Sequence, residues 1–323
     1  MSRYIVRRVV GLGVVLMLVL TLSFFMLHAI PGGPENAYLG MNPSVEKREA
    51  VRHMLGLDQS LWSQYLGFLR GMFTFDFGTS LTTNSSVNDM LMARIPVTLE
   101  LGLISFVVWT VIGLLLGAVA AVRKGTFVDG LVRVGSVVGL SVPSFWLGLV
   151  LVLTFGLYIP GVLPSSGWVP FSENPAQNLR TLVLPAFTLG IGSAAVIART
   201  LRSSLIHEME SDHVAFARAM GLREWTVLQR LALRNAVIPT LTVVGMMLGS
   251  FIGGAVLIEN VFNVPGLGQL IVSSFVSHDY PVAIAGTVWT ASIFLITTLV
   301  VDLLYFAINP RIRAQFSTTG GVR

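Results

Sequence analysis

The chain has 323 residues, of which 54% are apolar and 11% are charged, whereas soluble domains carry roughly a quarter of charged residues. This composition indicates a protein whose solvent is lipid. The formal charge of +5 does not indicate nucleic-acid binding, because the arginines punctuate apolar runs instead of forming a basic patch. The absence of cysteine excludes disulfides, thiolate metal sites and cysteine nucleophiles.

Six apolar runs meet or approach the length of about twenty residues that a helix needs to cross the hydrocarbon core. In chain order they are Val9–Ile30, Val97–Val122, Val134–Tyr158, Leu179–Ile197, Ala236–Ile258 and Val282–Ile308. The first run follows basic residues, as a signal peptide does, and Leu27-His28-Ala29 weakly resembles a cleavage site. It is longer than the core of such a peptide, about 7 to 15 residues, so we expect a retained anchor. The sequence predicts an all-α integral membrane protein with six transmembrane helices.

Lysine and arginine indicate the orientation, because basic residues close to membrane ends tend to stay in the cytoplasm. With the N-terminus inside, 15 of the 21 basic residues fall on the cytoplasmic side and six on the opposite side. Five of those six lie in the long first loop, where the rule is weak. We therefore expect both termini in the cytoplasm.

The connections between the runs predict how the chain is divided. We expect an N-terminal tail and first transmembrane helix (1–30), an extracytoplasmic cap (31–96), a five-helix core (97–308) and a cytoplasmic tail (309–323). The cap is too long for a simple connector and contains the amphipathic stretch Leu61–Phe73. Within the core, residues 199–235 form a long cytoplasmic loop.

The loop 199–235 has the pattern of two short helices. We expect Asp212 to cap the first helix and Gly221 to end it in a left-handed conformation. The expected apolar faces are Val214, Ala217 and Met220 in the first helix, and Trp225, Leu228 and Leu231 in the second. The second helix is expected to end near Pro239. Composition alone also allows a helix lying on the membrane surface, plain scaffolding, or a DNA-binding helix-turn-helix, although a loop tethered at both ends to membrane spans is a poor DNA reader.

Two stretches of the loop, Asp212–Leu222 and Ala232–Pro239, place a glycine and an Ile-Pro pair at a fixed distance. Further motifs follow in order: Ile30–Pro34, Leu55–Gln59, Gln64–Leu66, Phe75–Ser80, Thr98–Leu101, Pro143–Trp146, Leu184–Ala186, Asn263–Gly268, Asp302–Leu304 and Asn309–Arg313. Together they resemble the permease subunits of bacterial binding-protein-dependent ABC importers, in the dipeptide, oligopeptide and nickel branch. This chain departs from the branch at His213, Ala215-Phe216 and Met220, where Tyr, Arg-Thr and Lys are usual, which implies a more apolar groove in the partner.

The resemblance implies the type I ABC importer permease fold and a place in the bacterial inner membrane. In that family the loop forms a coupling helix that docks in a groove of the ATPase subunit. By resemblance this role falls on Ala217, Arg218, Ala219, Gly221 and Leu222. The family's outer gate region corresponds to Glu259, Asn263, Pro265 and Gly266.

The resemblance also implies partners. They are a second permease subunit, two ATP-binding-cassette ATPase subunits or domains that bind ATP and Mg, an extracytoplasmic substrate-binding protein, and membrane lipid. We expect no nucleic acid. Di- or oligopeptides are the expected substrates, with nickel, another metal chelate or another small solute of the branch as the alternative, because selectivity usually resides in the binding protein.

Few charges enter the spans. Asp302 lies near the cytoplasmic end of the last span, where Arg311 could pair with it, and Glu100 lies near the outer end of the second. Carriers driven by protons or sodium commonly need carboxylates at the midplane. The chain also lacks a Gly-x-x-x-x-Gly-Lys-Ser/Thr phosphate loop. We therefore expect a transport subunit that is not an enzyme, with no catalytic residue, cofactor or metal of its own.

An intramembrane protease is the enzyme alternative, because Gly192-Ser193 lies in an apolar span. A serine nucleophile there would need a buried base. Of the five histidines, only His28 approaches a span, and it sits near the outer edge. The sequence therefore favours the transport subunit.

Overall fold

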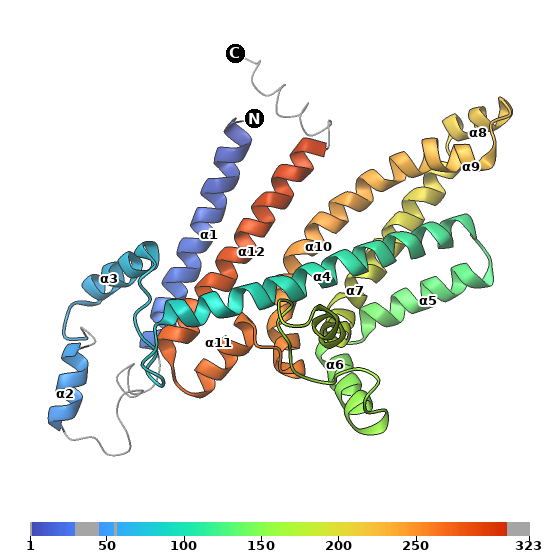
Figure 1. Ribbon diagram of the computed structural model, residues 1–323. Helices are drawn as coiled ribbons and strands as arrows, with labels where there is room; N and C mark the ends of the chain where they lie inside the picture. The colour runs from blue at the N-terminus through green and yellow to red at the C-terminus, as the bar shows by residue number, and fades with distance from the viewer. Residues whose placement is uncertain (1, 30–44, 55–56, 309–323) are drawn as a thin grey trace, which may run out of the picture. The chain divides into compact units, whose positions relative to one another are not determined.

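The structure, a computed structural model, describes residues 2–29, 45–54 and 57–308 (Figure 1). Its helices are α1 (Ser2–His28), α2 (Val45–Met54), α3 (Leu61–Thr74), α4 (Val87–Val122), α5 (Phe127–Ser141), α6 (Ser144–Leu153), α7 (Pro175–Met209), α8 (Asp212–Ala219), α9 (Glu224–Thr226), α10 (Leu233–Phe262), α11 (Leu267–Val276) and α12 (Tyr280–Ile308). Two π-helical segments, η2 (Thr154–Tyr158) and η3 (Val227–Ala232), extend α6 and precede α10. Within the described residues the only β pairing is an isolated bridge between Thr79 and Ser86. The all-α prediction is confirmed. The motifs at 30–34 and 309–313, and the tail 309–323, lie outside the described residues.

Several helices have the length and apolar character needed to cross a membrane. Among the described residues, five helices qualify alone, and up to seven spans are reached if each of two bent pairs counts as one. The five are Ile5–Met26, Val87–Val122, Pro175–Met209, Glu224–Gly249 and Tyr280–Leu303. The predicted number of six spans lies between these values of five and seven. The cytoplasmic placement of the termini stays a prediction.

The expectation of one continuous span over Val134–Tyr158 is wrong. The chain turns by 96° between α5 and the α6–η2 segment. Val142 is extended, with φ −83° and ψ 122°, and Pro143 follows it as the residue before α6. A residue before proline is pushed out of the α region by the proline ring, so the helix ends there.

Other helices run farther than predicted. α4 begins at Val87 and carries Pro96 inside it, ten residues before the expected start at Val97. α7 continues to Met209, past the predicted end at Ile197. The sequence between Ala198 and Glu210 contains no Gly or Pro, and Leu201 and Leu205 continue the buried face at 1% exposure each. The first third of the predicted loop is therefore helix.

Pro239 does not end the helix that precedes it. Glu224–Gly249 forms one helix that includes η3, and Pro239 lies within α10. A proline removes one backbone donor and presses on the carbonyl four residues earlier. Membrane helices tolerate it because neighbouring helices and local adjustments of helix type satisfy the freed groups.

By internal contacts the chain falls into two compact units, and the division by membrane topology stays a separate prediction. Unit 1 contains Glu100–Asn263 and the end of α12 from Thr297. Its helices α4 and α7 approach closely at Gly113 and Gly117, which are spaced as in Gly-x-x-x-Gly packing motifs. A Cβ atom on Gly117 would stand 2.6 Å from the Ala198 carbonyl oxygen. The absence of side chains at these positions therefore sets the distance between the two helices.

Unit 2 contains Ser2–Leu99 and Val264–Ile296. Its apolar core joins Leu20 of α1 to Tyr280, Ile284 and Val288 of α12, with residues of α3 packed against them. The predicted amphipathic stretch Leu61–Phe73 corresponds to α3, which starts at the capping residue Ser60. Parts of α1, α3, α12 and the segment before α4 line an open pocket of about 850 Å³.

Replacing Gly117 with Ala should lower the free energy of unfolding by about 2 kcal/mol, because the added methyl group meets backbone of α7 and forces the helices apart. Gly102→Ala, on the same helix, is the matched control, since a Cβ there meets nothing within 4 Å. Its effect should stay within about 1 kcal/mol and can be stabilising. Thermal melts of the purified protein in detergent measure both changes, and equal midpoints for the two variants would contradict the packing argument.

Candidate functional site: the α8–α9 tip

The α8–α9 tip, defined as Glu210–Thr226, begins with a capping residue that differs from the predicted one. Ser211 is the N-cap, with φ −76° and ψ 154°, and Asp212 is the first residue of the helix. The Ser211 hydroxyl donates to the Glu208 carbonyl at 2.5 Å, which ties the tip to α7. The prediction that Asp212 caps the helix is therefore wrong by one residue. Its carboxylate still lies in the first turn, where negative charge is favourable.

The end of α8 confirms the prediction made for Gly221. Gly221 has φ +79°, a left-handed conformation that glycine adopts without the cost imposed by a Cβ atom. The Leu222 amide donates to the Ala217 carbonyl at 3.2 Å, and the Gly221 amide donates to the Arg218 carbonyl at 2.9 Å. These two bonds form a Schellman motif, which satisfies carbonyls that the helix end leaves without partners.

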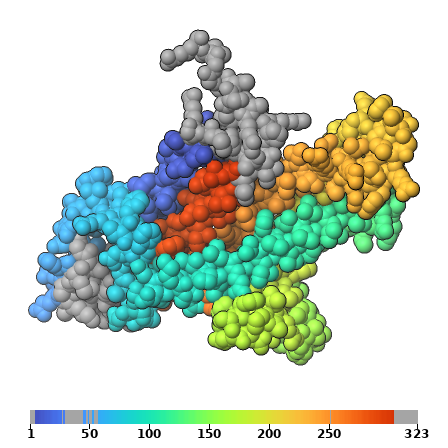
Figure 2. Space-filling view, turned by 45° about the horizontal axis from the view of Figure 1, so that its top comes forward, coloured from blue at the N-terminus to red at the C-terminus, as the bar shows by residue number. Residues whose placement is uncertain are grey.

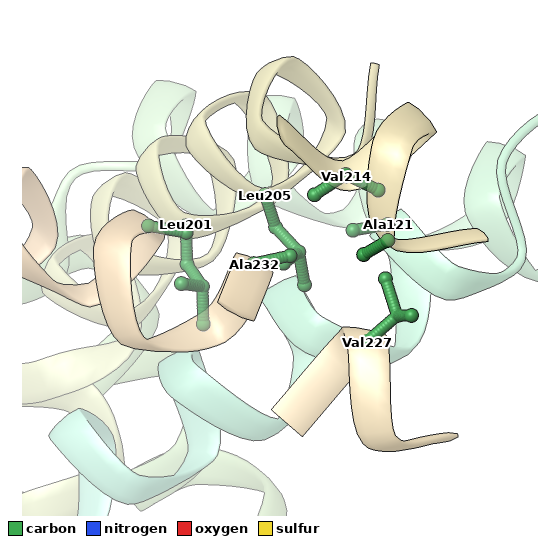
Figure 3. Packing of buried hydrophobic residues seen from close by; sticks show 8 residues of the cluster. Ala121, Leu201, Leu205, Val214, Val227 and Ala232 are labelled. Atoms are coloured by element: carbon green, nitrogen blue, oxygen red, sulfur yellow. The ribbon is translucent and has the colours of Figure 1, made fainter. Parts of the chain in front are cut away.

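One face of α8 is buried in unit 1. Val214 is 0% exposed and Ala217 is 6% exposed. Both belong to a buried apolar cluster that we call the tip cluster (Figure 3), whose members are Ala121, Leu201, Leu205, Val214, Ala217, Val227, Ala232 and Ala236. The cluster joins α8 to α4, α7, η3 and α10. Ala217 therefore holds α8 in place instead of facing outward.

The opposite face of the tip exposes large apolar side chains. Phe216, Met220 and Trp225 are 67 to 69% exposed, and Leu222 is 46% exposed. Figure 2 shows the surface of this region in yellow and light orange, uncovered on the side toward the viewer. Grouped exposed apolar residues mark interaction surfaces, because their contact with water is unfavourable. The tip therefore has the character of a docking surface.

Met220 and Trp225 were expected on the apolar faces of the two helices, and both side chains are exposed instead of packing with the buried members of those faces. For the second helix the reason is its geometry, since η3 is π-helical and α9 has only three residues. A π-helix bonds i to i+5, so the spacing of buried residues departs from the α-helical period. The buried residues are Val227 and Ala232, while Leu228 and Leu231 are only partly buried.

Arg218 makes three hydrogen bonds, two within the tip and one to the end of α7. Its Nε and Nη2 atoms donate to the Glu224 carboxylate at 2.7 and 3.3 Å, and its Nη1 donates to the Met209 carbonyl at 3.0 Å. The fork thus connects the end of α8 to the end of α7 and to the first turn of α9. Among the predicted coupling residues, Arg218, Ala219, Gly221 and Leu222 are exposed, but the Arg218 guanidinium is also held by hydrogen bonds to Glu224 and Met209.

A second charged contact flanks the tip. Lys124, after α4, pairs with Glu210, and both side chains are more than half exposed. The hydrogen bond from the Lys124 ammonium lowers the pKa of the Glu210 carboxyl, and its charge acts in the same direction. Exposed pairs of this kind contribute little to stability, about 0 to 1 kcal/mol.

The predicted outer-gate residues lie around the break between α10 and α11. In unit 1, Glu259 is 0% exposed in the last turn of α10, and Asn263 caps that helix with φ 52°. In unit 2, the Gly266 amide donates to the Val264 carbonyl at 2.8 Å, and Pro265 is half-buried. The connector is short, since only residues 263–266 separate the two helices. The gate role stays a prediction.

Two carboxylates singled out in the spans have defined positions. Glu100 accepts a hydrogen bond from the Trp168 indole at 3.1 Å, within unit 1. Asp302 lies inside α12 and is half-buried. Its predicted partner Arg311 lies outside the described residues.

Sequence reasoning missed two buried aspartates. Asp279, in unit 2, is 1% exposed and accepts hydrogen bonds from the Ser80 hydroxyl at 2.5 Å, the Leu81 amide at 3.1 Å and the Thr82 hydroxyl at 2.9 Å. Asp129, in unit 1, is also 1% exposed and pairs with Arg202. Both aspartates lie next to apolar runs of membrane length. The sequence feature that could have revealed them is an acidic residue beside a turn, which is Gly125-Thr126 for Asp129 and Ser277-His278 for Asp279.

The helices and their apolar lengths define an integral, multi-pass membrane protein. Residues 113–314 match the family described as binding-protein-dependent transport system inner membrane component. Residues 1–102 match the N-terminal family of the same transport systems' membrane components. The chain belongs to this family and is a multi-pass protein of the inner membrane.

Curated relatives align over nearly the whole chain. The dipeptide transport system permease protein DppB of Lactococcus lactis is 38% identical over 316 residues, which cover 97% of this chain and 100% of the relative. DppB of Bacillus subtilis is 36% identical, with 97% and 98% covered. The glutathione transport system permease protein GsiC of Escherichia coli K12 is 37% identical, with 97% and 99% covered. A crystal structure of an amino acid ABC transporter aligns with a TM-score of 0.47 and 17% identity over 69% of this chain and 94% of that chain.

Gly221→Ala should lower the stability of α8 by about 1 kcal/mol, because a Cβ atom makes the left-handed conformation costly. Asn tolerates that conformation better, so Gly221→Asn is the matched variant and should cost less. A Cβ atom meets nothing within 4 Å at this position, so a steric clash does not confound the comparison. Hydrogen exchange of the 212–222 amides measures the effect, and equal protection in both variants would count against the strained-backbone explanation.

A double-mutant cycle on Arg218→Ala and Glu224→Ala should give a coupling energy of a few tenths to about 1 kcal/mol in the isolated subunit, since both side chains are partly exposed. The matched cycle pairs Arg218→Ala with Glu210→Ala and should show additivity, because Glu210 pairs with Lys124 instead. Thermal unfolding provides the free energies. Additivity in the first cycle would mean that Arg218 does not act through Glu224.

Proposed function

We propose that this chain is the membrane-spanning permease subunit of an ATP-binding-cassette importer of di- or oligopeptides. The observation that carries the proposal is the alignment of 97% of the chain with a dipeptide permease protein at 38% identity. The 37% identity to a glutathione permease protein agrees with small peptides as the substrate class. A second permease subunit completes the pathway in this proposal, and an extracytoplasmic binding protein delivers the substrate.

Energy comes from separate ATPase subunits, which bind ATP and Mg. The chain itself carries no phosphate-loop motif, and it acts as a transport subunit without catalytic residues. The α8–α9 tip docks in a groove of the ATPase. Support for this placement comes from the exposed side chains of Phe216, Met220, Leu222 and Trp225.

The tip contacts are divided between two roles in this proposal. Phe216, Met220, Leu222 and Trp225 enter the partner groove, and Gly221 and Ala219 allow its walls to approach closely. Val214 and Ala217, at 0% and 6% exposure, anchor α8 to the membrane helices. Arg218 sets the angle between α8 and its neighbours through Glu224 and Met209. A force that the ATPase exerts on the exposed face of the tip is thus transmitted to the ends of the membrane helices without bending α8.

The test uses the complete transporter in proteoliposomes, with radiolabelled alanyl-alanine as the probe and nickel ions in a parallel assay. Uptake of the dipeptide should require ATP and all subunits. Phe216→Ala should weaken ATPase association by about 2 kcal/mol or more and lower uptake accordingly, because a large exposed aromatic anchor is lost. Ala215→Ser, at an exposed neighbouring position, is the control and should behave as the unchanged protein.

Copurification of the ATPase subunits measures the association directly. Uptake of nickel without uptake of the dipeptide would show that the substrate is a metal ion or chelate and not a peptide. Dipeptide movement by the purified chain alone would overturn the whole assignment, as would labelling of the tip from the extracytoplasmic side.

A further inference from the structure

Asp129 is a buried carboxylate with several donors around it. It lies in the first turn of α5 and is 1% exposed. The Arg202 guanidinium on α7 donates from Nε to Oδ1 at 2.5 Å and from Nη2 to Oδ2 at 2.8 Å. The Gly125 amide, in the connection between α4 and α5, donates to Oδ2 at 3.0 Å. One carboxylate therefore joins α5 to the connection that precedes it and to α7, all within unit 1.

The form of this ion pair fixes orientation as well as distance. A bidentate guanidinium–carboxylate pair allows one planar arrangement, whereas a lysine would act as a point charge. A buried ion pair is weak evidence for stability, because removing two charges from water costs about as much as their attraction returns. The geometry of Asp129 and Arg202 therefore suits a directional link between α5 and α7.

The location of Arg202 relates this link to the α8–α9 tip. Leu201 and Leu205 on α7 belong to the tip cluster, together with Val214 and Ala217 of α8. Arg202 lies beside Leu201 in the same turn and meets α5 instead. The same part of α7 thus contacts α8 through apolar side chains and α5 through the ion pair.

The tip cluster leaves α5 out. Its buried members come from α4, α7, α8, η3 and α10, and the partly buried residues packed against it come from the same helices. At the other end of α5, Gly139 approaches Ile191 and Ala195 of α7. Apolar contacts of this kind are non-directional. The Asp129–Arg202 pair therefore supplies the directional contact between α5 and the helices that carry α8.

We propose that Asp129 and Arg202 are positioning residues that make α5 follow α8, so that a displacement of the tip also moves the bent α5–α6 segment. The inference rests on the proposed docking of the tip to an ATPase. The α6 segment follows because it continues from α5 after the 96° bend at Val142–Pro143. The exposed Lys124–Glu210 pair also connects the α4–α5 side to the end of α7, but its exposure makes it a weak link.

Two variants separate the link from simple stability. Asp129→Asn combined with Arg202→Gln removes both charges of the pair, so neither partner is left as an uncompensated ion. Arg202→Lys keeps the cation and loses the bidentate fork. Arg133→Gln is the matched control, because Arg133 also lies near Asp129, with Nε 3.8 Å from Oδ1, but is 61% exposed.

The measurement is a set of distances between spin labels in the complete transporter. The chain has no cysteine, so labels can be placed in this subunit without removing native residues. One pair reports on α5, with cysteines at Leu131 and Met246, which are 61% and 70% exposed. A second pair reports on α8, with cysteines at Ala215 and Met246. Each distance is compared between nucleotide-free and vanadate-trapped complexes.

In the unchanged protein and in Arg133→Gln, both distances should shift on trapping. In the two link variants, the α8 shift should remain while the α5 shift is lost in the double variant and reduced in Arg202→Lys. Alanyl-alanine moved per ATP hydrolysed should fall by roughly 2- to 30-fold. ATPase copurification should be unchanged.

An unchanged α5 shift in both link variants would overturn the inference, and so would loss of the α8 and α5 shifts together. Failure of both variants to assemble would make the pair an assembly determinant and would overturn it as well. The proposed function fails by a different result, namely the absence of ATPase copurification and of any α8 shift in the unchanged protein.

Discussion

The packing of Val214 and Ala217 into the tip cluster, against residues of α7 and η3, is the interaction on which the rest of the α8–α9 tip depends. Because this face of α8 is buried, its other face turns outward with Phe216 and Met220. Small side chains make the contact possible, since Ala121, Ala232 and Ala236 let backbones approach at the same place. A larger residue at any of these alanines would overpack the tip cluster.

Close helix approach elsewhere in unit 1 follows the same rule. Gly113 and Gly117 let α4 lie against α7, and Gly190 leaves room for the Trp109 ring, whose indole donates to the Ala186 carbonyl at 2.8 Å. Lipid offers no hydrophobic drive between helices, so packing and a few hydrogen bonds must hold them. The pair of the buried Asp129 with Arg202 adds a directional contact to this apolar packing.

Apolar length and turn chemistry predicted much of the fold. The long helices, α3 and the left-handed Gly221 follow from local residues. The break at Val142–Pro143 was missed because the apolar run continues on both sides, although the proline itself was the signal. The continuation of α7 to Met209 was missed because polar residues there suggested a loop, while Leu201 and Leu205 kept the helical face. The exposure of Trp225 could not be read from a period of 3.6, because α9 has only three residues and continues into the π-helical η3. The pairing of Asp129 with a residue 73 positions away is set by tertiary packing, which local patterns do not encode.

The right-angled turn between α5 and α6 makes α5 a lever arm. Its 15 residues rise by about 1.5 Å each, so the arm is roughly 22 Å long. A tilt of about 5° about the Asp129 end would carry the Val142 end sideways by about 2 Å, and α6, set across the arm, would be swept by the same amount. The length of α5 thus converts a small rotation into a displacement of α6 that is comparable to the radius of a water molecule or more.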